Sequence, residues 1–121
     1  YLELGELTPQ SRKDGSAGHP LGEVTLYAGF DWRVEGPRSI RGGSKSRRSR
    51  RGVLAKRLEG STILKAEVTG RIPELAVHFS NGWWLVTFDA YGGQPEWTIH
   101  FNKPDLGHLG VKNGRLTANA R

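Results

Sequence analysis

The chain has 121 residues, a length typical of one domain, and it contains no cysteine, which excludes disulfides and thiolate metal sites. No apolar run approaches the roughly 18 residues that a membrane helix needs, and the start at 1–4 lacks the features of a signal peptide. We therefore expect a single domain over residues 1–121 with no membrane partner. The expected location is the cytoplasm, which the absence of cysteine fits, since disulfides are rare there. The sequence also lacks methionine, so either the native start has been removed or these residues belong to a longer chain.

The formal net charge of +6 is concentrated in one segment. Residues 38–57 hold nine of the eighteen Lys and Arg residues and no acidic residue. The other nine basic residues are outnumbered by twelve acidic ones, which leaves the rest of the chain at −3. The sequence thus predicts a mildly acidic body with one basic segment, whose glycine- and serine-rich part forms a flexible loop at about residues 41–52.

The first third of the chain predicts strands and a loop. Residues 1–8 can form a short strand, and residues 9–22, with glycines and prolines among polar residues, are typical of a loop. Apolar residues then alternate from Val24 to Val34, which predicts one long half-buried strand. Gly29 indicates a bulge or bend midway along it.

The second part of the chain predicts a short helix and then a meander of about five strands. Leu54 and Leu58 are four residues apart, which favours a helix over residues 53–59 that ends at Gly60. Alternating apolar residues follow in several runs, and the pair at 113–114 (Asn-Gly) is a further hairpin signal. The fold class expected is mainly β (α+β): an antiparallel meander, small sandwich or half-barrel with one short helix.

The pair Asn81-Gly82 is the clearest local signal, because an Asn-Gly pair favours a two-residue type I′ hairpin loop. That loop would pair Phe79 with Trp84 and bring apolar residues of both strands onto one face. The predicted core face consists of Leu75, Val77, Phe79, Trp84, Val86 and Phe88. The opposite face would carry His78, Trp83 and Leu85.

The basic segment is the first candidate binding site. Its cations can neutralise phosphates of a nucleic acid, although the run contains no aromatic residue for base stacking. The alternatives are a solvated loop or contact with an acidic partner. Gly43–Ser46 lacks the spacing of a phosphate-binding loop.

Trp83 is a second candidate binding residue, either as an exposed anchor for a partner or as part of a second small core. The candidate binding residues are Arg41, Lys45, Arg47, Arg48, Arg50, Arg51 and Trp83.

No catalytic motif stands out. The chain has neither a cysteine nor a G-x-S-x-G nucleophile elbow, and its carboxylates are scattered singly. His78 and His100 share the less apolar side of their strands and can be neighbours, with Asp89 or Glu96 close by. We therefore predict no catalytic residues, no metal and no cofactor, and keep an enzyme that uses His78 or His100 as a third hypothesis.

Five short runs together carry a resemblance to a known family. They are 30–34 (FDWRV), 40–44 (IRGGS), 58–62 (LEGST), 74–82 (ELAVHFSNG) and 96–99 (EWTI). Over about residues 24–116 the chain resembles a widespread family of small uncharacterised bacterial proteins, mainly actinobacterial, whose function is unknown. Some members resemble compact β proteins encoded beside bacterial toxins, which confer immunity by binding. The very basic insert departs from the family pattern.

The resemblance and the residues together favour a bacterial cytoplasmic protein that is not an enzyme and acts by binding another protein, with an immunity-type role as one form. The rival hypothesis is a nucleic-acid-associated protein that binds through residues 38–57.

Overall fold

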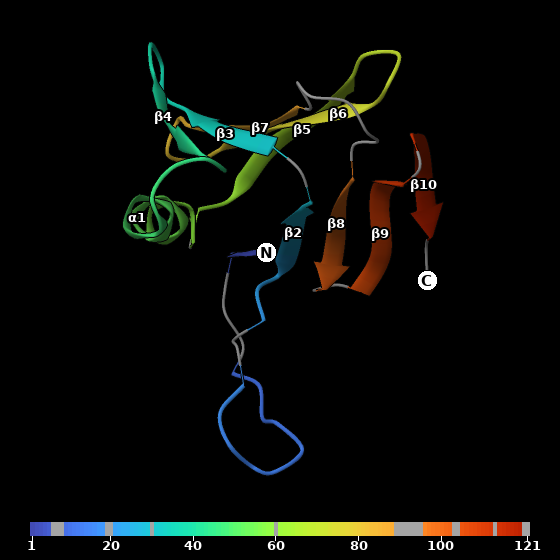
Figure 1. Ribbon diagram of the computed structural model, residues 1–121. Coiled ribbons are helices and arrows are strands. Elements are labelled where there is room, and N and C mark those ends of the chain that lie inside the picture. The colour runs from blue at the N-terminus through green and yellow to red at the C-terminus, as the bar shows by residue number, and fades with distance from the viewer. Residues whose placement is uncertain are drawn as a thin grey trace.

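A computed structural model describes residues 1–5, 9–18, 21–29, 31–59, 61–88, 96–102, 105–112 and 114–119. In this part of the chain the fold is mainly β, with two antiparallel five-stranded sheets and one helix (Figure 1). Neither sheet closes into a barrel. The predicted fold class, mainly antiparallel β with one short helix, is confirmed.

The two sheets use strands from different parts of the chain. The first sheet has the order β1 (Leu2–Leu4), β2 (Val24–Ala28), β8 (Trp97–Asn102), β9 (Asp105–Lys112) and β10 (Arg115–Asn119). The second sheet has the order β4 (Ile40–Gly43), β3 (Asp31–Glu35), β7 (Trp84–Phe88), β6 (Glu74–Phe79) and β5 (Ile63–Thr69). Helix α1 (Arg48–Leu58) joins β4 to β5, the two edges of the second sheet. The predicted five-strand meander is therefore divided between the sheets.

The long strand predicted from Val24 to Val34 is wrong as a single element. It is two strands, because β2 pairs with β8 in the first sheet and β3 pairs with β7 in the second. The chain changes sheets beside Gly29, whose amide donates to the Glu96 carbonyl at 2.8 Å. Leu26 and Val34 are both buried, so each half keeps its apolar residues turned inward. The bend was predicted at the right residue, but it divides the strand between two sheets.

The core lies between the inner faces of the two sheets and the inward side of α1. Leu54 and Leu58 are 1% and 2% exposed, as their spacing predicted. Each sheet contributes further apolar side chains to the same cluster. The buried residues are Leu4, Leu26, Val34, Leu54, Leu58, Leu75, Val77, Phe79, Leu85, Trp97, Ile99 and Val111.

The hairpin between β6 and β7 is confirmed, but its predicted register is wrong by one residue. Val77 faces Leu85 and His78 faces Trp84. The Phe79 amide donates to the Trp83 carbonyl, so the loop has three residues, not two. Gly82, with φ +88°, is the left-handed residue that closes such three-residue loops.

The register determines which face of β7 enters the core. Leu75, Val77 and Phe79 are buried as predicted. On β7 the buried residues are Leu85 and Thr87, whereas the three predicted core residues are half-buried on the opposite face. Those three residues are Trp84, Val86 and Phe88.

The predicted loop at 41–52 and the predicted helix at 53–59 also need correction. Strand β4 occupies the start of that range, and α1 begins at Arg48, five residues earlier than predicted. Between them, described residues 44–47 form the connection. Gly60, the predicted end of the helix, lies outside the described residues. The predicted hairpin at 113–114 is confirmed by the pairing of β9 with β10, and β1 is the predicted N-terminal strand.

Candidate functional site

Helix α1 carries most of the candidate binding residues and presents different groups on its different sides. Its inward stripe consists of Leu54 and Leu58. Arg50 and Arg57 are seven residues apart, nearly two full turns, and share the flank that is turned toward β4 and the β6–β7 hairpin. Lys56 and Val53 are exposed to solvent.

Two helix arginines hold α1 against β4 and the hairpin. The Arg50 guanidinium donates two hydrogen bonds to the Arg41 carbonyl, at 3.1 and 2.9 Å. The guanidinium carbons of Arg41 and Arg57 lie 5.7 and 6.0 Å from the centroid of the Trp83 ring. Trp83 itself packs against the core and is half-buried. We call Arg41, Arg50, Arg57 and Trp83 the clamp.

Close backbone approach supports the clamp. A Cβ added to Gly42 of β4 would lie 2.6 Å from Cδ1 of Leu54, which is itself buried. Only glycine therefore lets β4 come this close to the helix without a shift of the Leu54 side chain. Gly42 thus serves the docking of α1, whereas Gly43 allows close pairing with β3, where an added Cβ would lie 2.4 Å from the Trp32 carbonyl oxygen. The sequence alone placed both glycines in a loop.

From Lys45 to Lys56, the cations outside the clamp are exposed. Arg47, Arg48, Arg51 and Lys56 are exposed and have no carboxylate partner among the described residues. The amine of Lys45 lies 3.8 Å from a carboxylate oxygen of Asp31, and its side chain is 81% exposed, so that contact is weak. We call Lys45, Arg47, Arg48, Arg51 and Lys56 the free cations.

Three of the free cations, at the start of the helix, oppose its electrostatics. Arg48 and Arg51 stand in the first turn and Arg47 is the N-cap residue, while the first turn has no acidic side chain and no side-chain cap. The start of a helix carries a partial positive charge, so cations there are unfavourable and anions are favourable. The same positive charge makes this end of α1 attractive to an acidic group from outside.

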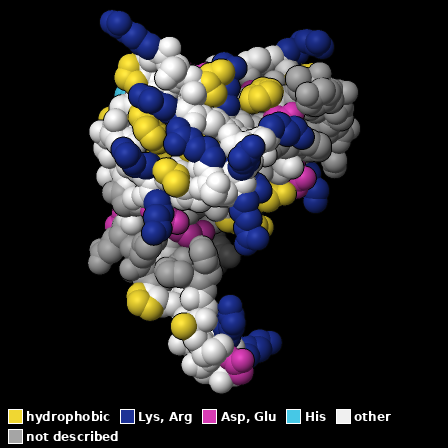
Figure 2. Space-filling model, turned by 60° about the vertical axis from the view of Figure 1, so that its left-hand side comes forward, with side chains coloured by type: hydrophobic (Ala, Val, Ile, Leu, Met, Phe, Trp, Pro, Cys, Tyr) yellow, Lys and Arg dark blue, Asp and Glu magenta, His cyan; other side chains and the backbone are white. Residues whose placement is uncertain are grey.

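Apolar side chains are interspersed among the cations. Figure 2 shows Lys and Arg side chains spread over the face on which α1 and β4 come forward, with hydrophobic side chains between them. Ile40 is 61% exposed and Val53 is 48% exposed. Arginine is enriched at protein interfaces, and the buried centre of an interface is more apolar than the rest of the surface. We call the free cations together with Ile40 and Val53 the basic face.

The candidate residues predicted from sequence thus divide into two groups. Arg41, Arg50 and Trp83 are brought together in the clamp, while Lys45, Arg47, Arg48 and Arg51 belong to the basic face. Arg57 and Lys56 were not among the predicted site residues. The seven-residue spacing of Arg50 and Arg57 would have pointed to Arg57 if the helix had been predicted from residue 48.

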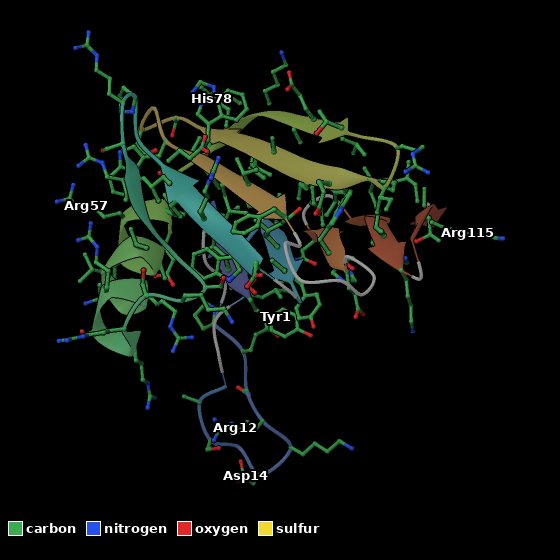
Figure 3. The ribbon with its side chains drawn as sticks, turned by 45° about the horizontal axis from the view of Figure 1, so that its top comes forward. Tyr1, Arg12, Asp14, Arg57, His78 and Arg115 are labelled. Atoms are coloured by element: carbon green, nitrogen blue, oxygen red, sulfur yellow. The ribbon has the colours of Figure 1, made fainter. Side chains whose placement is uncertain are left out.

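The predicted proximity of His78 and His100 is wrong, because they lie in different sheets. The His78 ring stacks on Trp84, with centroids 4.4 Å apart, on the outer face of the second sheet (Figure 3). His100 instead faces His108 across β8 and β9, with ring centroids 5.3 Å apart. Asp89 lies outside the described residues. Within the part of the chain that the structure describes, no three His, Cys, Asp or Glu residues form a metal-binding group.

Comparisons of the chain with models of protein families, with curated proteins and with solved structures found no match. Among the described residues, no helix has both the length and the apolar character to cross a membrane. The family resemblance of the sequence therefore stays a prediction, and the candidate site rests on its own geometry.

Proposed function

We propose that the protein is a binding module that recognises an acidic surface of a partner protein through the basic face. The observation that carries the proposal is the cluster of arginines at the start of α1, which has no internal carboxylate partner among the described residues and opposes the helix dipole. Such an arrangement lowers the stability of the free protein and becomes favourable when negative charge is brought to it. An immunity-type role, in which a small protein covers the surface of a toxin, is one form of such binding.

Two features favour a protein partner over a nucleic acid. Proteins that bind single strands offer aromatic rings on which bases stack. Trp83 is half-buried and already lies beside the guanidiniums of Arg41 and Arg57. The exposed aliphatic residues Ile40 and Val53 add nothing to phosphate contacts, whereas they suit the apolar part of a protein interface.

The test is photo-crosslinking in the organism that encodes the chain. A photoreactive phenylalanine analogue replaces Val53 on the basic face, and a matched variant carries it at Leu116, which is similarly exposed on β10 of the other sheet. We expect a specific protein adduct at position 53 whose partner has an acidic surface, and no such adduct at position 116. Combining the analogue with Arg48→Glu should reduce the yield of the adduct at least tenfold.

The rival function is tested with the purified protein. Fluorescence anisotropy with a labelled 20-nucleotide single strand and a 20-base-pair duplex, at 50 and 200 mM salt, measures nucleic-acid binding and its salt dependence. We expect only weak binding that disappears at the higher salt concentration, as charge alone dictates. Tight binding to either nucleic acid at 200 mM salt, together with the absence of a protein adduct at position 53, would overturn the proposal in favour of nucleic acid.

A further inference from the structure

A cavity of about 360 Å³ lies where the two sheets meet α1. Its floor consists of aliphatic side chains from all three layers: Leu26 of β2, Val34 of β3, and Leu54 and Leu58 of α1. These four residues are 0–2% exposed, so they belong to the core and offer a ligand almost no surface. The accessible lining includes the half-buried Leu2, Ala28, Trp32 and Ala55. At roughly 30 Å³ for each water-sized group, the cavity has room for about a dozen such groups.

The wall and mouth of the cavity supply aromatic rings and one charge. Trp32 of β3 lines it, and Tyr1, which is 86% exposed, stands at its mouth with its ring 4.9 Å from that of Tyr27. Arg51 has the one charged side chain among the described lining residues. Arg48, one helical turn earlier, adds a second cation on the same side of α1. The accessible lining is therefore mixed, with apolar side chains beside polar groups and one cationic side chain.

We propose that this cavity binds a medium-chain aliphatic carboxylate, with its chain against Ala28, Trp32 and Ala55 and its carboxylate on the Arg51 guanidinium. Pockets of this size that combine an apolar lining with a few polar groups are typical of small-molecule sites. A guanidinium matches a carboxylate in both charge and geometry, since it can donate two parallel hydrogen bonds. No acidic side chain among the described lining residues competes for Arg51. This site is separate from the basic face except for Arg51, and it does not depend on the proposed protein partner.

Comparing ligands that differ only in their head group tests whether the Arg51 guanidinium binds the carboxylate. Isothermal titration calorimetry with decanoate, decan-1-ol and decyltrimethylammonium, all below their aggregation concentrations, compares three head groups on one chain. We expect decanoate to bind one to one and at least tenfold more tightly than decanol, with the cation weakest. In Arg51→Gln the preference for decanoate over decanol should disappear, while the affinity for decanol stays within twofold. The matched control Arg71→Gln, at another exposed arginine, should keep the preference.

Variants whose larger side chains fill the cavity test whether the ligand binds there. Ala55→Phe and Ala28→Leu each place a larger side chain on the lining from a different element, and each should weaken decanoate at least tenfold. Ala66→Phe, at an exposed site on β5, is the matched control and should bind as the unchanged protein does. Circular dichroism identifies the filled variants that fold, and amide chemical shifts of the unchanged protein with decanoate give an independent location. Equal affinity for decanoate and decanol, unchanged binding in a folded cavity-filling variant, or shifts centred away from Trp32 and Leu54 would each overturn the proposal.

Discussion

Reversing the charge of Arg48 should change the stability of the protein and its binding to a partner in opposite directions. Arg48 is the first residue of α1, exposed, and without a carboxylate partner among the described residues. A charge in the first turn changes helix stability by about 0.3–1 kcal/mol, unfavourably for a cation and favourably for an anion. Arg48→Glu removes the unfavourable charge and adds a favourable one, so we expect a gain of about 1 kcal/mol. For a domain of this length that gain raises Tm by roughly 4 °C.

The matched control is Lys56→Glu at the other end of the helix. Lys56 stands in the last turn, where a cation is favourable, so its reversal should lower Tm by a similar amount. Both variants should nevertheless reduce the crosslinking yield at Val53, because both residues belong to the basic face. Thermal unfolding, monitored by circular dichroism, measures the changes in Tm. Both changes should be smaller in 0.5 M salt, because salt screens the charges. A fall in Tm for Arg48→Glu would refute the electrostatic reasoning, and an unchanged yield in both variants would refute the interface.

Three further predictions concern backbone and turn geometry. Gly42→Ala should destabilise the fold by about 1–3 kcal/mol in denaturant unfolding, because the added methyl group would meet buried Leu54; a value near zero would mean that α1 shifts freely. Gly82→Ala should cost about 1–2 kcal/mol through its positive φ alone, since its surroundings are open, and an unchanged midpoint would contradict the three-residue loop. Hydrogen bonds from the Ser16 hydroxyl and amide lower the pKa of Asp14, so their contribution is present at neutral pH and is lost as the pH falls through that pKa. Ser16→Ala should raise this pKa toward its usual value in an NMR titration, and no change would show that the hydroxyl bond is absent in solution.

The sequence located the β6–β7 hairpin but could not determine its register. A glycine in the left-handed region closes both two-residue and three-residue loops, so the Asn-Gly pair fits either one. The strand after the loop is apolar on both faces, with Leu85 on one and Trp84 on the other, so its pattern did not distinguish them. The ladder places Trp84 opposite His78, where the two rings stack on the outer face. Only contacts between strands carry that information.

For the basic segment too, the sequence predicted the features that depend on neighbouring residues but not the contacts with residues distant in the chain. Its charge was evident from composition, and Leu54 and Leu58 marked the inward side of the helix correctly. Which cations are used internally depended on Trp83, which lies on a different hairpin far along the chain. The prediction of one long strand from Val24 to Val34 was wrong for a related reason. Both of its halves face one core, so the pattern continues unbroken across the change of sheet.

The change of sheet beside Gly29 also bears on the order of folding. Strands β5 to β7 and strands β8 to β10 each join neighbours in the chain, so two small meanders can form from local contacts. Strands β2 and β3 pair with β8 and β7, partners that are distant in sequence, and we expect these pairings to form later because closing long loops costs chain entropy. Because so short a connection joins β2 to β3, docking of either strand brings the other to its place. We therefore expect the two meanders to join in one late event, which would also complete the cavity beneath α1.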